Sequence, residues 1–431
     1  MKNSIQLGIL CLILLALSCK QAIGEQKAKS DPELTDKEYA ASTVNTSVGV
    51  LHLDAPYATA STAKISTTRD WPENTLPNAP EGFTVSKLAE GFDNPRWTYI
   101  APNNDIFVVE SNSRNSANRI TILRDSNNDG KFEVREPFLE NLNQPFGMLI
   151  VGSYFYVANT DGLVRYPYKE DMTQMTNAKG EIIVSLPAGG YNNHWTRNII
   201  INEAKDKIYI SVGSASNVAE HGMKEEIRRA NILEVNLDGS NEIVYADGLR
   251  NPVGMDWNPI TGELWAAVNE RDKLGNNLVP DYATSVKKGG FYGWPYSYYG
   301  QIIDPRMADS IDDALVAQAI IPDVPTGNHT ASLGFTFYTG NQFPEFYKNG
   351  AFVGQHGSWN RENFSGYKVV FIPFTKGRPT SMPVDFLSGF VADGDGSTVY
   401  GRPVGVTETP QGDLLVNDDT GGVIWKVTYT K

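Results

Sequence analysis

Four basic residues and one amide each stand where an apolar, strand-like run is about to begin. Arg250 and Asn251 lie in GLRNPVGMDWNP, and Arg361 and Arg402 hold corresponding places in later segments. Guanidinium groups pair with carboxylates through two parallel hydrogen bonds, so three arginines predict a ligand with several carboxylates. His194, in GGYNNHWTRN, precedes a run in the same way, and a histidine accepts protons near neutral pH. The alternatives are arginines that cap carbonyl groups and a hydrogen-bonded loop histidine.

Two further histidines occupy similar junctions. His329, in GNHTASLG, is a candidate for cofactor binding, and His356 lies in GQHGSWNR. His52 and His221 are expected at the surface. The chain contains no GxxxxGK[ST] loop and no GxGxxG after a strand, which argues against nucleotide cofactors. It also lacks HExxH and GxSxG. Its net charge of −13, without a long basic run, argues against a nucleic-acid partner.

Two loops are candidates for calcium. The first, DSNNDGKFEVRE, places oxygen ligands at the first, third, fifth and twelfth positions of a calcium loop, namely Asp125, Asn127, Asp129 and Glu136. The strand-like FEV run argues against the usual exiting helix, so a plain hairpin loop is equally expected. The second, NERDKLGNNLVPDY, starts at Asn269 and follows the strand that begins after Arg250. Its carbonyl and carboxylate groups suit a metal, and a solvated loop is the alternative.

A recurring pattern predicts the fold. A Pro or Arg junction, a short apolar run, a turn and a β-branched or aromatic run occur in six copies, which start at Asn94, Gln144, Thr196, Asn251, Thr330 and Arg402. Most copies are followed by another short strand, so each unit offers about four strands. Helical periodicity is confined to 220–229 and 308–319. The sequence therefore predicts an all-β, six-bladed β-propeller of four-stranded antiparallel blades, whose loops converge around one channel mouth.

The N-terminal part predicts export. Residues 1–18 have one early lysine and an apolar run, as a signal peptide does, and Leu-Ala-Leu-Ser before Cys19 resembles a lipoprotein cleavage site. We expect a periplasmic or outer-membrane protein held by a lipid on Cys19, with a plain secretory signal as the alternative. Cys11 lies inside the signal, so no disulfide is expected. Residues 19–80 are predicted as a tether and loosely docked leading segment, and 81–431 as the propeller.

Several segments in order carry a family resemblance. These are KDKIYISVG, ANILEVNLDGS, GLRNPVGMDWNP with GELW, VKKGGFYGWPYSYYG and GRPVGVTETPQGDLLVNDDTGGVIWKVT. They resemble the soluble sugar dehydrogenases that use pyrroloquinoline quinone (PQQ), the glucose/sorbosone dehydrogenase family, and the sorbosone branch is the nearer likeness. The resemblance runs from about Gly82 to the C-terminus.

The resemblance implies roles for individual residues. His194 matches the general base, and Arg250 with Asn251 matches the pair that contacts the quinone. Arg402 matches another cofactor-binding arginine, and Arg361 is a looser match. The family's activating calcium is held partly by backbone carbonyl groups, which correspond to those of Glu270 and Arg271.

The implied reaction oxidises a sugar or a sugar-derived aldehyde. His194 would take the hydroxyl proton while hydride moves to the quinone, and Arg250 with calcium would stabilise the charge on the quinone oxygen. A cytochrome or the quinone pool would then accept the electrons. Three positions depart from the glucose-oxidising members: Val253 replaces a glutamine, Val404 an arginine, and Ser214 the acidic residue that orients the histidine. A propeller that only binds carbohydrate or protein, and a calcium-dependent lactonase, are therefore the alternative functions.

Overall fold

A computed structural model describes residues 39–175, 177–392 and 397–430. The predicted signal peptide, Cys11, Cys19 and the first part of the predicted tether lie outside these ranges. Within them, no helix combines the length and the apolar character needed to cross a membrane.

Six blades, each with four antiparallel strands, confirm the predicted propeller, and in the third blade β20 (Gly290–Phe291) adds a short parallel strand beside β16. The first three sheets comprise β5 (Pro95–Ile100), β6 (Ile106–Glu110), β7 (Arg119–Arg124) and β8 (Val134–Leu139); β9 (Met148–Val151), β10 (Tyr154–Asn159), β11 (Gly162–Pro167) and β12 (Glu181–Ser185); β13 (Ile199–Ile201), β14 (Lys207–Val212), β15 (Asn231–Asn236) and β16 (Ile243–Asp247). The last three comprise β17 (Pro252–Trp257), β18 (Leu264–Val268), β19 (Pro280–Ser285) and β23 (Val324–Asn328); β24 (Thr336–Phe337), β25 (Ala351–Gln355), β26 (Lys368–Ile372) and β29 (Val384–Leu387); β31 (Pro403–Glu408), β32 (Leu414–Asp418), β33 (Val423–Tyr429) and β4 (Phe83–Glu90).

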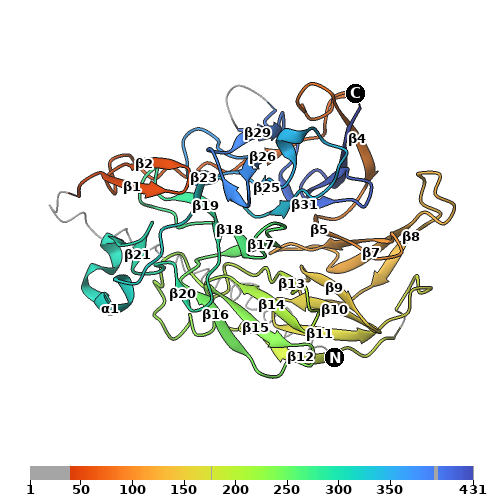
Figure 1. Cartoon of the computed structure of the whole chain (residues 1–431), viewed down its shortest axis with the longest axis horizontal. Helices are drawn as coiled ribbons and strands as arrows, with labels where there is room; N and C mark the ends of the chain where they lie inside the picture. The colour runs from red at the N-terminus through yellow and green to blue at the C-terminus, as the bar shows by residue number, and fades with distance from the viewer. Residues whose placement is uncertain (1–38, 176, 393–396, 431) are drawn as a thin grey trace, which may run out of the picture. The chain divides into compact units, whose positions relative to one another are not determined.

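The sheets follow one another around a ring, from orange through yellow and green to blue in Figure 1. The ring is closed by a strand from the other end of the chain: β4 pairs antiparallel with β33, from Glu90 opposite Val423 to Phe83 opposite Tyr429. The sixth blade is thus built from both ends of the propeller sequence.

An apolar cluster lies where the innermost strands meet. Phe146, Val253, Leu333 and Val404 are buried together, and Trp97 packs against them. The backbone at Gly334 and Gly354 lies close to that at Val404, since a Cβ on either glycine would collide with the Val404 carbonyl group. Val253 and Val404, two of the positions that depart from the glucose-oxidising members, therefore form part of the floor beneath the channel mouth.

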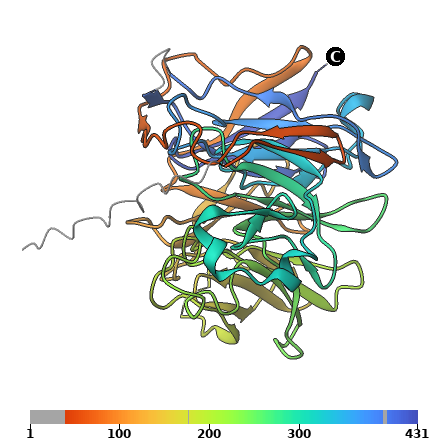
Figure 2. The same ribbon diagram turned by 90° about the vertical axis from the view of Figure 1, so that its left-hand side faces the viewer.

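The segment before the propeller is packed more firmly than the sequence predicts. The compact unit begins at Ala40, and the hairpin of β1 (Ser42–Thr46) and β2 (Gly49–Leu53) buries Val44 and Leu53 against the third and fourth sheets. Figure 2 faces this hairpin, which lies in front of green and cyan strands. Farther along, β3 (Thr67–Thr68) pairs with β30 (Thr398–Val399).

Short elements fill the connections between blades. They are β20 (Gly290–Phe291), β21 (Ser297–Tyr298), β22 (Ile302–Ile303), β27 (Phe374–Thr375), β28 (Arg378–Pro379), the 3-10 turns η1 (Pro305–Ser310) and η2 (Glu345–Tyr347), and the helix α1 (Asp313–Val316). The helical pattern at 308–319 thus yields one turn of α-helix. At 220–229 the backbone forms turns instead, because the acidic and basic side chains there contact neighbouring loops, as Glu226 and Arg229 do.

Candidate functional site

Four of the predicted functional residues lie in segments that lead into innermost strands. His194 precedes β13, Arg250 and Asn251 directly precede β17, and Arg402 directly precedes β31. His194, Arg250 and Asn251 are buried and Arg402 is half-buried, although three of the four carry a charged or titratable side chain. Burial of such groups requires partners, so their contacts define what the site can do.

Three segments meet at Gly213. A Cβ at this position would collide with Asn251 Oδ1 on one side and His194 Cβ on the other. The next residue, Ser214, donates its backbone N–H to the Arg250 carbonyl oxygen over 2.7 Å. The end of β14 therefore holds the histidine and the Arg-Asn pair against each other, as the blade repeat predicts.

His194 has a defined tautomer. Its Nδ1 atom lies 2.9 Å from both the carbonyl oxygen and the hydroxyl oxygen of Ser214. A carbonyl oxygen only accepts hydrogen bonds, so Nδ1 carries the proton and Nε2 carries the free lone pair. Burial, followed by the nearby charge of Arg250, lowers the pKa of His194 well below its ordinary value. The ring is therefore neutral at pH 7 and has a basic nitrogen at Nε2.

Arg250 is committed to protein acceptors. Its Nε and Nη2 atoms donate to the carbonyl and side-chain oxygens of Asn217 over 3.0 and 2.9 Å. Nη1 donates to the carbonyl oxygens of Asn269 and Glu270 over 3.2 and 2.7 Å, and Asp272 lies 3.5 Å from Nη2. Burial lowers the pKa of this guanidinium, and Asp272 and Glu270 oppose that effect. Arg250 thus holds two loops together. These contacts correspond to the alternative given in the sequence analysis, in which the arginines cap carbonyl groups.

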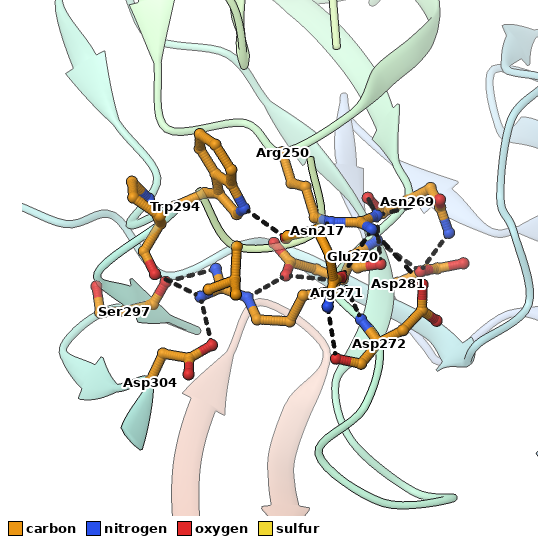
Figure 3. Close-up of polar contacts among 12 residues, drawn as sticks. Asn217, Arg250, Asn269, Glu270, Arg271, Asp272, Asp281, Trp294, Ser297 and Asp304 are labelled. Atoms are coloured by element: carbon orange, nitrogen blue, oxygen red, sulfur yellow. Dashed lines mark hydrogen bonds and ion pairs between the residues drawn. The ribbon is translucent and has the colours of Figure 1, made fainter. Parts of the chain in front are cut away.

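The neighbouring Arg271 forms a second buried network. It contacts the carboxylates of Glu270 and Asp304 over 2.9 and 3.2 Å and donates to the carbonyl oxygens of Pro295 and Ser297. Figure 3 shows the Arg271 side chain extending toward Ser297 and Asp304 while Arg250 lies against Asn217 and Asn269. The Glu270 carbonyl oxygen, predicted as a calcium ligand, is thus already an acceptor for Arg250.

A second charged cluster surrounds Arg402. Its Nε and Nη2 atoms donate to the carbonyl oxygens of His356 and Gly357 over 2.9 and 3.0 Å. The His356 ring contacts Asp419 over 2.9 Å, and Arg96 contacts the same carboxylate oxygen over 2.5 Å. Burial and the charge of Arg402 lower the pKa of His356 to about 4. The cluster therefore holds a buried carboxylate between a neutral imidazole and an arginine.

Sequence reasoning missed Arg96 and Asp419. Arg96 follows Asn-Pro in NPRW, at the start of the first repeat copy, so the blade register contained a signal for it. Its guanidinium lies over the ring of Trp195, 5.3 Å from the centroid. Because Trp195 follows His194, this contact joins the Arg402 cluster to the histidine loop.

Two predicted cofactor ligands lie in other surroundings. His329 contacts Asp272 through Nδ1 over 3.1 Å and the Gly275 carbonyl oxygen through Nε2 over 3.0 Å. Burial opposes a charge on His329, yet the hydrogen bond to Asp272 raises its pKa. Both ring nitrogens thus contact protein groups in this structure, and the cofactor-binding role of His329 stays a prediction. Arg361 is half-buried and contacts the Asn277 side chain over 3.3 Å.

The predicted calcium loop differs at its last ligand. Asp125, Asp129 and Glu133 bring carboxylate oxygens within 4.8 Å of one another. Glu136 instead lies within β8, and its carboxylate accepts from Gln174 over 2.7 Å. β8 begins at Val134, so the extended backbone carries Glu136 away from the loop. Among the described residues, these three form the one group of His, Cys, Asp or Glu side chains close enough together to share a metal ion.

The family model named TrAA12-like matches residues 77–288 and 298–430. The chain belongs to the TrAA12-like family. An uncharacterised protein of Borreliella burgdorferi is 30% identical to this TrAA12-like chain over 302 residues, covering 68% of this chain and 77% of that protein. The sorbosone branch that the sequence favours receives no support from these matches.

A PQQ-dependent pyranose dehydrogenase of Coprinopsis cinerea is 23% identical over 408 residues. That alignment covers 81% of the TrAA12-like chain but 54% of the enzyme, so the chain spans about half of the enzyme's length. The solved PQQ domain of a pyranose dehydrogenase from C. cinerea superposes with a TM-score of 0.66 at 21% identity, over 84% of this chain and all of that domain. This likeness confirms the propeller fold.

Proposed function

We propose that this chain is a PQQ-dependent dehydrogenase that oxidises a sugar or a sugar-derived aldehyde, with aldoses and sorbosone as the first candidates. One observation carries the proposal: His194 is a buried, neutral imidazole whose Nε2 is basic, in a site next to buried arginines. The family assignment and the PQQ-dependent relative support the cofactor.

The polar groups of the site fit an anionic quinone. Asn251 Oδ1 and Arg96 Nε are buried polar atoms with no hydrogen-bond partner among the described residues. Such atoms cost free energy unless a ligand or water satisfies them. Arg96 and Arg402 would hold carboxylates of the cofactor, and Asn251 would accept from an N–H group. Arg250 would contribute its charge while it remains bonded to the two loops.

The cofactor, when bound, supplies the acceptor for the hydride that leaves the substrate carbon. His194 Nε2 takes the proton of the substrate hydroxyl group, since Nδ1 is protonated and tied to Ser214. Burial and, after it, the nearby charge of Arg250 keep the imidazole unprotonated before substrate arrives. The buried surroundings exclude water and thereby strengthen these electrostatic effects.

Calcium, a partner and an exported location belong to the same proposal. A calcium ion at the mouth would share the Glu270 carbonyl oxygen with Arg250, and the loop that contains Asp125 and Asp129 offers a separate structural site. We propose that a cytochrome or the quinone pool accepts the electrons. We also propose that the protein is exported to the periplasm or outer membrane and anchored through Cys19.

The test is a calorimetric titration with PQQ, with and without calcium, followed by dye reduction with a panel of aldoses and sorbosone. We expect binding and substrate-dependent reduction in the natural chain. His194→Ala should abolish reduction while PQQ binding remains, because the base does not hold the cofactor carboxylates. Arg402→Ala should weaken PQQ binding. A natural chain that neither binds PQQ nor reduces the dye would overturn the proposal in favour of a propeller that binds carbohydrate or protein.

A further inference from the structure

Glu226 has a buried carboxylate that is connected to the His194 ring by two hydrogen bonds in series. Glu226 accepts from the backbone N–H groups of Ala215 and Ser216 over 2.7 and 3.1 Å, and from the Ser216 hydroxyl over 2.6 Å. Its side chain thereby fixes the segment that follows Gly213. Burial raises the pKa of Glu226 even though these donors oppose the shift.

Ser214 connects that segment to the imidazole. Its hydroxyl donates to the Ser216 carbonyl oxygen over 2.7 Å, so the same hydroxyl accepts at its lone pairs. The His194 Nδ1–H therefore points at two acceptors, the Ser214 carbonyl and hydroxyl oxygens, each 2.9 Å away. Neither acceptor carries a formal charge.

We propose that Ser214 and Glu226 are positioning residues that hold His194 in the tautomer with a basic Nε2. Ser214 provides the neutral acceptors in contact with the ring, and the Glu226 carboxylate fixes the segment that carries them. This inference rests on the proposed role of His194 as the base. It accounts for the orientation of the ring with serine at position 214, where the sequence resemblance implies an acidic residue in the glucose-oxidising members.

The arrangement has a specific consequence for proton affinity. A carboxylate in contact with Nδ1 stabilises the imidazolium form and raises the histidine pKa. With carbonyl and hydroxyl oxygens there, that stabilisation is weaker. Burial lowers the pKa of His194 most, and the charges of Arg250, Arg197 and Arg229 lower it further. His194 consequently stays unprotonated at mildly acidic pH. The rate of the reaction should therefore decline only at lower pH.

The first experiment observes the ring directly. Histidine labelled with 15N in the full chain reports each tautomer by NMR, without cofactor or turnover, and His194→Asn assigns the signal. The natural chain should show protonated Nδ1 and unprotonated Nε2 from neutral to mildly acidic pH. Glu226→Gln places an amide N–H against a backbone donor, so the His194 signal should shift toward a mixture of tautomers.

The second experiment measures the pH profile of dye reduction. Ser214→Asp should move the acid limb to higher pH by roughly one to three units. Glu226→Gln should lower kcat roughly tenfold with little change in KM. Ser211→Ala is the matched control: Ser211 is buried in β14, three residues before Ser214, and its hydroxyl accepts from Asn198 N–H over 3.1 Å. It should leave tautomer and pH profile unchanged.

The outcomes separate the two proposals. Unchanged tautomer populations in Glu226→Gln, together with an unmoved acid limb in Ser214→Asp, would overturn the positioning roles even if the enzyme is active. Should the tautomers respond as expected while His194→Ala retains full activity, the base assignment would fail and the positioning geometry would stand. If Ser214→Asp does not fold, the NMR comparison of Glu226→Gln with Ser211→Ala still decides.

Discussion

Arg250 Nη1 donates to the Glu270 carbonyl oxygen over 2.7 Å, which places a buried cation on the carbonyl group assigned to calcium by resemblance. The same guanidinium binds Asn217, so it joins two loops that lie far apart in the sequence. Arg250 therefore contributes to the folded structure whether or not a ligand is bound.

We expect Arg250→Ala to lower the free energy of unfolding by about 3 kcal/mol or more, because it leaves buried carbonyl oxygens without their donor and removes the ion pair with Asp272. Urea denaturation followed by circular dichroism measures this change. Arg228→Ala is the control, since Arg228 pairs with Glu242 at a more exposed site and should cost less than about 1 kcal/mol. Equal losses in both variants would contradict the clamp role.

Calcium binding at the loop should depend on Glu133 and not on Glu136. Calcium should raise the melting temperature of the natural chain, and Glu133→Gln should reduce that increase because it removes one of three converging carboxylates. Glu136→Gln is the matched variant, three residues farther along within β8. Thermal unfolding with calcium and with chelator decides, and a loss confined to Glu136→Gln would restore the spacing that the sequence suggests.

Acid should destabilise the protein through His356. The unfolded chain takes up this proton below pH 6.5, whereas the folded chain takes it up only near pH 4. The unfolded state therefore binds more protons between these values, so stability falls as the pH drops from 6.5 toward 4, by up to about 3 kcal/mol from this group. His356→Gln does not titrate, and its unfolding free energy should fall less over this range. Parallel curves for both proteins would refute the assignment.

A polar side chain in the apolar cluster beneath the channel mouth should destabilise the protein. Val253→Gln would bury an amide among Phe146, Leu333 and Val404, and an unsatisfied amide costs about 1–3 kcal/mol. We expect lower thermal stability without tighter PQQ binding, which calorimetry measures. Val253→Leu, which keeps an apolar side chain, is the comparison. Tighter PQQ binding in Val253→Gln would show that the amide reaches the cofactor.

Sequence reasoning found the blades because their innermost strands begin with similar junctions, and those junctions converge in any propeller. For this reason His194, Arg250, Asn251 and Arg402 were placed at the correct strand starts. Their partners depend on side-chain directions that no repeat encodes. His329 occupies a junction as well, yet Asp272 and Gly275 use both of its nitrogens.

The structure differs from the sequence-based predictions at two further places, and each difference has a local cause. Glu136 fits the spacing of a calcium loop, but β8 begins at Val134 and an extended strand advances too far per residue to keep Glu136 at the loop. Residues 40–80 read as a loose segment because alternation is weak there. Val44 and Leu53 suffice to bury the hairpin against the propeller.

The pairing of β4 with β33 also determines when the molecule can be completed. The last blade lacks its innermost three strands until the residues up to Tyr429 have been synthesised, and β4 has no partner before then. Until then the ring cannot close, because β4 lacks the strand that joins it to the rest of the last blade. The complete fold can therefore form only after β33 has been synthesised. A chain that lacks β33 should be unable to close the ring.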